Sequence, residues 1–338
     1  MSDNNPTQAP LLDIQDLQVN FHTRRGLVRA VRNLNLSINE GETLALVGES
    51  GCGKSVTAHA ITRLVPMPPG DIASGSILFR GDNLLDLSER EMRTLRGSKI
   101  SMIFQEPMTS LNPVFTIGTQ IAEVFRTHTN MGKKEAFEKA VELLDLVKIP
   151  APAKRAQSYP HQLSGGMRQR AMIAMALASP EPGLMIADEP TTALDVTIQA
   201  QILQLLSELK ERVGMSILLI THDMGVVAET ADRVAVMYAG RKVEDAPVEE
   251  LFANPQHPYA AGLLGCQPSS PQNKGAHRLE SIDGSVPDLL SIGEECPFSN
   301  RCPNASDRCR AGFPEKSEAG PNHAYWCHHP ISNSGVAS

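Results

Sequence analysis

The feature that most constrains the fold is a glycine-rich segment between an apolar run and a helix-forming run. Residues 48–55 hold two glycines separated by four residues and followed by Lys54 and Ser55, which is the spacing of a polyphosphate-binding loop. Residues 43–47 read as a buried strand, and residues 56–61 can continue as a helix. A strand, a glycine turn and a helix N-terminus direct several backbone N–H groups at one point. The segment therefore predicts nucleotide binding, with Lys54 on the phosphates and Ser55 on a magnesium ion.

The composition favours a well-buried α/β core. The chain has 338 residues, of which 41% are hydrophobic and only 4% aromatic, enough for one large or two modest domains. The net charge of −7 argues against a general nucleic-acid-binding protein, because such proteins cluster Lys and Arg. Residues 1–10 are polar, are expected to be disordered and lack the pattern of a secretory signal. No apolar run approaches the length of a membrane span, so we expect a cytoplasmic protein.

Polar side chains follow three other apolar runs, each of which reads as a buried strand. Gln105 follows one run, Asp188 and Glu189 end the next, and His222 follows the last. Ligands in open α/β sheets bind outside the carboxyl ends of the strands. Neighbouring residues of a strand point to opposite faces, so one carboxylate can lie near magnesium while the other activates water. Each residue alone also has an ordinary structural explanation, but their shared placement favours a site together with Gly48.

A second candidate anion site precedes a helix. Ser164 can cap that helix, and Gly165 and Gly166 would let a ligand approach its first N–H groups. A simple capped helix start explains the same residues. Upstream, residues 117–148 read as two amphipathic helices, which indicates a helical subdomain.

Together these motifs resemble the nucleotide-binding subunit of an ABC transporter, over residues 11–252. The resemblance implies an α/β fold of the ABC-type P-loop NTPase class, with a RecA-like core sheet, an antiparallel β subdomain and an α-helical subdomain at about residues 106–178. The expected domains are a disordered segment at 1–10, the nucleotide-binding domain at 11–260, and a carboxy-terminal extension with four cysteines at 261–338.

The same resemblance implies which residues bind ATP and Mg²⁺. Phe21 would stack on the adenine. The complete ATP-binding set would be Phe21, Gly48, Glu49, Ser50, Gly51, Cys52, Gly53, Lys54, Ser55, Val56, Gln105, Ser164, Gly165, Gly166, Asp188 and Asp195. The magnesium ligands would be Ser55, Gln105 and Asp188.

The resemblance also assigns catalytic roles. Glu189 would be the general base, His222 would contact the γ-phosphate and Lys54 would bind phosphate. Ser164 and the two glycines after it would cover the ATP of a partner subunit, which implies a head-to-tail dimer with two ATP molecules at its interface. Met167 stands where the family often has Gln, and we interpret it as a subfamily trait.

Three further runs, at residues 104–113, 159–161 and 254–259, resemble the oligopeptide/dipeptide importer branch of the family. That branch implies ATP hydrolysis that drives peptide import. Its partners would include two membrane permeases, which would dock at Gln105 and the helical region after it. A second ABC ATPase, expected to be a paralogue, would form a heterodimer with this chain. A separate periplasmic or extracellular protein would bind the peptide. The expected location is the cytoplasmic face of the inner membrane, as a peripheral protein. Glutathione and nickel importers share much of the pattern, so the cargo stays open.

Four of the six cysteines lie in the tail, at Cys296, Cys302, Cys309 and Cys327. Disulfides are disfavoured in the cytoplasm, so clustered thiols indicate a metal site or chance. Zinc is one alternative, with the neighbouring histidines as substitute ligands, and an iron–sulfur cluster is another. The importer branch carries a similar four-cysteine arrangement, which in some members holds a 4Fe–4S cluster. In the zinc alternative, the substitute ligands would be His323, His328 and His329.

Two rival functions come from other classes of protein. The first is a soluble ABC ATPase that acts on nucleic acid in chromosome maintenance or repair. Members of that class with long arms insert a coiled coil between the phosphate loop and the motif that corresponds to Ser164. Here only about 110 residues, without sustained heptads, separate Gly53 from Ser164. The second is a redox or metal sensor centred on the cysteine tail, with ATP as a regulator.

Overall fold

The computed structural model describes residues 9–105, 110–191, 195–267 and 281–331. The chain forms two compact units, the first made of residues 1–85 and 221–338 and the second of residues 86–220. Four sequence-based expectations lie partly or wholly outside the described residues. They concern the amino-terminal segment at 1–8, residues 106–109 of the importer-like run, residues 193–194 before Asp195, and the linker at 268–273.

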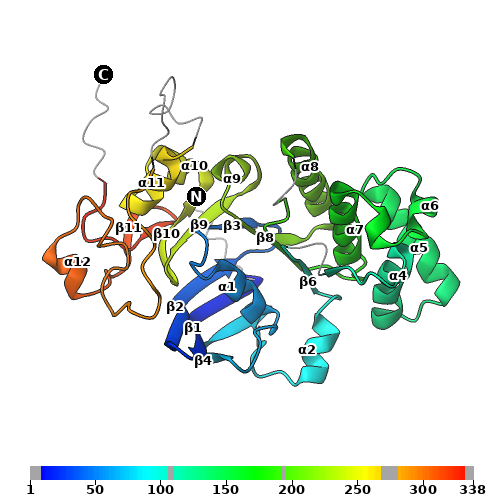
Figure 1. Ribbon diagram of the computed structural model, residues 1–338, viewed down its shortest axis with the longest axis horizontal. Coiled ribbons are helices and arrows are strands. Elements are labelled where there is room, and N and C mark those ends of the chain that lie inside the picture. Colours follow the sequence, from blue (N-terminus) through cyan, green and yellow to red (C-terminus); the bar gives the residue numbers. More distant parts are fainter. Residues whose placement is uncertain (1–8, 106–109, 192–194, 268–280, 332–338) are drawn as a thin grey trace, which may run out of the picture. The chain divides into compact units, whose positions relative to one another are not determined.

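An antiparallel sheet of the first unit has the strand order β2-β1-β4-β5, and Figure 1 shows β1, β2 and β4 side by side. Leu34 and Leu36 of β2 are buried while Asn33 and Asn35 are exposed, which confirms the alternation expected of a half-buried strand. The strands are β1 (Leu12–Thr23), β2 (Gly26–Ile38), β4 (Gly70–Phe79) and β5 (Asp82–Asn83).

The first unit also contains five strands in the order β11-β12-β10-β9-β3. β3 and β9 are parallel, and the remaining pairs are antiparallel. All five residues of β3 are buried, as its apolar sequence predicts. The strands are β3 (Thr43–Val47), β9 (Arg233–Tyr238), β10 (Arg241–Pro247), β11 (Ser317–Gly320) and β12 (His323–Tyr325). The helices are α1 (Lys54–Ile61), α9 (Met224–Thr230), α10 (Val248–Ala253), α11 (Pro258–Gly265) and α12 (Asp307–Ala311).

The carboxy-terminal extension packs into the same hydrophobic core as the central strands. One buried cluster contains Val47 of β3, Val236 of β9, Tyr259 of α11, and Phe298 and Cys309 of the extension. The strand before the glycine-rich loop and the carboxy-terminal extension therefore share one core. The predicted boundary at residue 261 stays a prediction.

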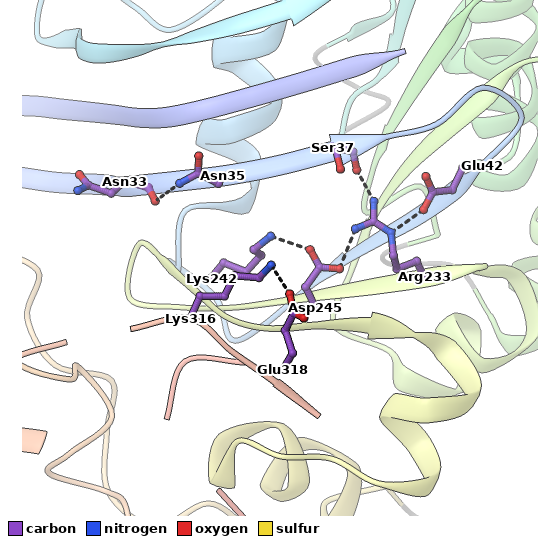
Figure 2. A network of polar contacts seen from close by, with 9 residues as sticks. All are labelled: Asn33, Asn35, Ser37, Glu42, Arg233, Lys242, Asp245, Lys316 and Glu318. Atoms are coloured by element: carbon purple, nitrogen blue, oxygen red, sulfur yellow. Dashed lines mark hydrogen bonds and ion pairs between the residues drawn. The ribbon is translucent and has the colours of Figure 1, made fainter. Parts of the chain in front are cut away.

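A polar network ties β9 to its surroundings in the first unit (Figure 2). The Arg233 guanidinium donates to a carboxylate oxygen of Glu42 at 2.7 Å and of Asp245 at 2.8 Å, and also to the Ser37 carbonyl. Lys242 donates to the other oxygen of Asp245 at 2.6 Å. Burial alone would raise the pKa of Asp245, but Lys242 and Arg233 outweigh burial and lower it. The network therefore holds a buried carboxylate in its charged form.

The second unit contains the parallel strands β8-β7-β6, with helices α4 to α7 gathered together in Figure 1. Two helices occupy residues 117–146, which confirms the amphipathic pattern. None of the helices that the structure describes combines the length and apolar character needed to cross a bilayer. The strands are β6 (Ile100–Ile103), β7 (Leu184–Asp188) and β8 (Ser216–Thr221). The helices are α2 (Glu89–Leu95), α4 (Ile117–His128), α5 (Lys133–Leu146), α6 (Pro152–Ala156), η1 (Pro160–Gln162), α7 (Gly165–Leu177) and α8 (Val196–Val213).

Candidate functional site

The glycine-rich loop joins β3 directly to α1, as its sequence predicts. Gly48 has a φ of +150° and Gly53 a φ of +105°, values that residues with side chains rarely adopt. A Cβ atom on Gly48 would lie 2.2 Å from the Met237 carbonyl oxygen, and one on Gly53 would lie 2.5 Å from the Ala30 carbonyl oxygen. Both positions therefore require glycine, and the resulting turn places the N-terminus of α1 beside the loop.

Lys54 places a cation inside this loop. Its side chain is only 5% exposed, and Nζ donates to the carbonyl oxygens of Gly48 at 2.7 Å and of Glu49 at 3.1 Å. Burial raises the pKa of the adjacent Cys52 thiol, and Lys54 opposes that shift without reversing it. A neutral thiol, a buried ammonium and a helix N-terminus together make a site for an anion.

His222 shares a cavity with the start of the loop. The cavity measures about 420 Å³ and is lined by Gly48, Glu49 and His222 among others. His222 is followed by Asp223, whose carboxylate caps α9 by accepting from the Gly225 N–H at 2.9 Å. The rest of the lining is Val47, Met224, Leu263, Cys266, Gln267, Ser281 and Ile282.

The other predicted residues of the first unit lie on or beside these elements. Phe21 is half-buried on β1 and pairs with Gly70 of β4. Ser50 and Gly51 are exposed at the tip of the loop. The remaining predicted residues, Ser55 and Val56, are half-buried in the first turn of α1.

The second unit brings two of the predicted polar residues together. The Gln105 side chain donates to a carboxylate oxygen of Glu189 at 2.9 Å. Glu189 directly follows β7 and has a φ of +46°, a conformation that costs a non-glycine residue energy and is concentrated at functional sites. Its N–H donates to the Ile220 carbonyl at 2.9 Å, while Asp188 is only 3% exposed. The predicted convergence with Gly48 and His222 joins residues of both units, and it stays a prediction.

The second candidate anion site, at Ser164, lies at the start of α7. Ser164 caps the helix, and Ser164 and Gly165 are exposed. A Cβ atom on Gly166 would lie 3.0 Å from a methyl carbon of Ile198. The N–H of Ile198 donates to the Asp195 carboxylate at 2.9 Å, so Asp195 caps α8 as Ser164 caps α7. The starts of these two helices are therefore packed together and leave the Ser164 side of α7 open to solvent.

Comparisons with known proteins identify the family of this chain. Residues 31–192 match the ABC transporter family, and residues 243–309 match the carboxy-terminal region of oligopeptide/dipeptide transporters. The chain is 53% identical to the probable peptide ABC transporter ATP-binding protein y4tR of Sinorhizobium fredii, over 96% of both chains. It is 56% identical to the oligopeptide transport ATP-binding protein OppD of Bacillus subtilis, over 86% of this chain and 81% of that one. The dipeptide transport ATP-binding protein DppD of the same organism is 51% identical, over 94% of both chains.

The chain belongs to the ABC transporter ATP-binding proteins. Solved structures of ABC proteins confirm the predicted fold class. The dimeric structure of the bacterial ABC transporter cassette MJ0796 superposes with a TM-score of 0.63 at 29% identity, over 70% of this chain and 98% of that one. A second dimeric structure of MJ0796, in a post-hydrolysis state bound to ADP and Pi, gives the same TM-score at 28% identity. This ABC protein is therefore an ATPase.

The four cysteines of the ABC protein's extension line one small cavity (Cys296, Cys302, Cys309 and Cys327). Burial raises the pKa of Cys296 to about 11 and that of Cys327 to about 12, so these thiols are protonated at neutral pH unless a cation is near. His328 and His329 line the same cavity.

One of the three histidines proposed as zinc ligands lies outside the cysteine cavity. His323, considered as a substitute zinc ligand, does not line that cavity and instead contacts the buried Glu244 carboxylate at 2.8 Å. Within the described ranges, no group of three or more His, Cys, Asp or Glu side chains is arranged to hold a single metal ion. Among the described residues, neither the zinc ion nor the iron–sulfur cluster expected from the sequence therefore finds support.

Sequence reasoning missed two contacts of the phosphate loop. Arg301 of the extension forms an ion pair with Glu49 at 2.6 Å, and no motif marks Arg301. The Tyr259 hydroxyl accepts from the Glu49 N–H at 2.8 Å. Tyr259 was visible only as part of the importer-like run at residues 254–259, where nothing indicated a role at the loop.

Proposed function

We propose that this ABC protein is the ATP-hydrolysing subunit of an importer for dipeptides or oligopeptides. The observation that carries the proposal is the presence in one chain of the phosphate loop and of a region matching the carboxy-terminal region of oligopeptide/dipeptide transporters. The names of the relatives, which refer to peptide, oligopeptide and dipeptide transport, support this cargo class. Glutathione and nickel are the alternative cargoes.

The first unit would bind the nucleotide. The N–H groups of the loop and of the first turn of α1 would hold the phosphates, with Lys54 exchanging its carbonyl partners for phosphate oxygens. Ser55 would ligate the magnesium ion, Phe21 would stack on the adenine, and His222 would contact the γ-phosphate. Mg²⁺, when bound, neutralises charge that develops on the phosphates. The glycine geometry of the loop and the cavity shared with His222 support these assignments.

The second unit would supply the hydrolytic groups. Glu189 would orient a water molecule and accept its proton, while Gln105 and Asp188 would complete the magnesium ligands. The hydrogen bond from Gln105 to Glu189 supports this division, because it fixes the carboxylate beside a residue assigned to the metal. Separate roles for Asp188 and Glu189 also agree with their burial, since Glu189 is the less buried of the two.

The working assembly would contain more than this chain. Ser164 and Gly165 are exposed at the start of α7, where they could cover ATP bound to a second ABC ATPase in a head-to-tail dimer. Both MJ0796 structures are described as dimeric. Two membrane permeases would dock near Gln105 and the helical region, and a separate peptide-binding protein would deliver the cargo. In this arrangement the chain would lie at the cytoplasmic face of the membrane, where ATP is available.

The test is ATP hydrolysis and peptide uptake by the chain reconstituted in vesicles with its permease pair and second ATPase. We expect hydrolysis to rise on assembly, and Glu189→Gln to lower it by about 10²–10⁴-fold, the usual contribution of a general base. The matched control is Glu181→Gln, which removes an exposed carboxylate of the same unit and should leave the rate unchanged.

The same vesicles distinguish the cargoes and the rival functions. Uptake of a labelled dipeptide or oligopeptide supports the proposal, whereas uptake of glutathione or nickel alone replaces the cargo. Hydrolysis that ignores the permeases but is stimulated by DNA or RNA contradicts the importer and favours the soluble ABC ATPase.

We also propose that the cysteine cavity holds a 4Fe–4S cluster. Four thiols of one cavity are a suitable donor set for such a cluster. The proposal rests on this shared cavity and on the four-cysteine resemblance alone, because no group of three or more His, Cys, Asp or Glu side chains among the described residues is arranged to hold a metal ion. Cys296, Cys302, Cys309 and Cys327 would be the ligands.

Metal analysis of chain purified without oxygen tests this assignment. We expect about four irons and four acid-labile sulfides per chain, the content of one such cluster, with a visible absorbance that Cys296→Ser abolishes. Cys266→Ser is the matched control, because Cys266 lies outside the cavity, and it should keep the iron. Stoichiometric zinc without iron would support the zinc alternative, and metal-free protein would mean unliganded thiols. A variant in which all four of these cysteines are replaced by alanine tests the sensor function. Loss of ATP hydrolysis by that isolated protein would favour the sensor.

A further inference from the structure

The phosphate loop is held by a residue of the carboxy-terminal extension. Both terminal nitrogens of Arg301 donate to the Glu49 carboxylate, at 2.6 and 3.1 Å. The Arg301 side chain is 5% exposed and that of Glu49 is 28% exposed. A two-pronged contact between a guanidinium and a carboxylate is strong and fixes the orientation of both groups. Glu49 is the second residue of the loop, so this contact restrains the loop at its start.

Arg301 is itself fixed by other contacts of the first unit. Nε donates to the Asp283 carbonyl at 2.9 Å, and Nη2 donates to the Ile282 carbonyl at 3.1 Å. Nη1 donates to the Tyr238 hydroxyl at 3.1 Å. All three guanidinium nitrogens are therefore engaged, and Glu49 meets a rigid partner rather than a mobile surface side chain.

Tyr259 restrains the backbone of the same loop residue. Its hydroxyl accepts from the Glu49 N–H at 2.8 Å, and the residue is fully buried. Tyr259 packs against the rings of Tyr238 and Phe298, with ring centres 4.6 and 5.4 Å away. The hydroxyl cannot move without disturbing this aromatic cluster.

We propose that Arg301 and Tyr259 are positioning residues that hold the phosphate loop in its nucleotide-binding shape. The inference rests on the proposed role of that loop in ATP binding. Every polar group of Glu49 is engaged, since the carboxylate meets Arg301, the N–H meets Tyr259, and the carbonyl accepts from Lys54. The extension thereby sets where Lys54 and the neighbouring N–H groups lie when the phosphates arrive.

Nucleotide binding by the full chain tests this role. We expect Arg301→Gln to raise the Kd for a fluorescent ATP analogue by about tenfold, because the loop must then be ordered at the expense of binding energy. Arg301→Lys should restore only part of the affinity, since lysine cannot make the two-pronged contact. The matched control is Arg310→Gln, which removes an exposed arginine of the same extension and should leave the Kd unchanged.

A double substitution separates loop positioning from general stability. If Arg301 acts through Glu49, the Arg301→Gln/Glu49→Gln chain should bind no more weakly than the weaker of the two single variants. The effect should fall on Kd and KM, with kcat largely retained, whereas a merely structural role would lower the melting temperature and leave Kd intact.

Several outcomes decide the matter. A folded Arg301→Gln chain with wild-type Kd overturns the inference. If Arg301→Gln does not fold, Tyr259→Phe decides instead, because it removes only the hydroxyl; wild-type Kd in that variant also overturns the inference. Absence of nucleotide binding by the wild type and by Arg310→Gln would instead mean that the proposed function of the loop is wrong, and the inference would fall with it.

Discussion

At the scale of single residues, two glycines before and within the phosphate loop show two separate reasons for a glycine. Gly53 has a positive φ, and a Cβ atom there would overlap the Ala30 carbonyl. Gly41 also has a positive φ, of +72°, but a Cβ atom there would meet nothing within 4 Å. Both positions have a positive φ, but only Gly53 lacks room for a Cβ atom. Comparing them therefore separates the cost of the backbone conformation from the cost of steric overlap.

We expect Gly41→Ala to lower the free energy of unfolding by about 1–2 kcal/mol, the cost of a left-handed conformation. Gly53→Ala should cost more, at least about 3 kcal/mol, because the backbone must also shift. It should also weaken ATP binding, which Gly41→Ala should not. Urea unfolding followed by Trp326, the single tryptophan and a residue of the same unit, measures both. Equal losses of stability would contradict the steric argument.

Local chemistry explains which residues the sequence could predict. The loop glycines, Lys54 and the cap at Ser164 act on neighbours a few residues away, so spacing reveals them. Arg301 and Glu49 are 252 residues apart, and neither has a periodicity or motif that indicates its partner. Their contact depends on the tertiary packing of the extension, which sequence patterns do not report.

At the scale of elements, the Arg233 network joins β9 to β2 and β10 (Figure 2). Arg233 and Asp245 are nearly buried, at 16% and 9% side-chain exposure. Removing one member of a buried charged pair leaves the other uncompensated. Loss of one charge of this network should therefore lower the stability of the first unit.

We expect Asp245→Asn to lower the free energy of unfolding by about 3–5 kcal/mol at neutral pH. Because the folded-state pKa of Asp245 is lowered, its contribution is present above its unfolded pKa of about 3.9 and is lost as pH falls through the folded value. The difference between wild type and variant should thus shrink below about pH 4. Melting temperatures measured from pH 3 to pH 7 check this. Glu318→Gln, which breaks an exposed pair nearby, should change nothing measurable.

Most elements of the nucleotide-binding region were predictable, because apolar runs and helical periodicity are local signals. β3, β7 and the helices α4 and α5 lie where those signals place them. The short strands β11 and β12 were not predicted. They have three or four residues with little apolar content, and they exist because they pair with β10.

At the scale of the whole molecule, the proposed dimer makes a further prediction. Glu189→Gln should trap ATP, so a mixture of this variant and its partner ATPase should double in mass when ATP is added. Adding Ser164→Arg should prevent that change, because a bulky cation would occupy the exposed start of α7. Gln157→Arg, at another exposed position of the same unit, is the control. Light scattering measures the mass, and a dimer that tolerates Ser164→Arg would contradict the head-to-tail arrangement.

The candidate site as a whole was only partly predictable. Their places after apolar runs predicted Gln105, Glu189 and His222 as site residues, and their convergence stays a prediction. The structure adds the contact between Gln105 and Glu189 and the cavity shared by Gly48 and His222. The partner subunits could not be predicted in detail, because the pattern of buried residues in this chain carries no information about the surfaces of other chains.

The contact between Arg301 and Glu49 has a consequence for exchanging segments between relatives. The match to the ABC transporter family ends at residue 192, and the match to the transporter-specific region begins at residue 243, which suggests a natural place for a junction. A chimera joined there would inherit its loop carboxylate from one parent and its guanidinium from the other. Chimeras should therefore transport only when both parents carry this acid–base pair, or when Glu49, Tyr259 and Arg301 are transplanted as one set.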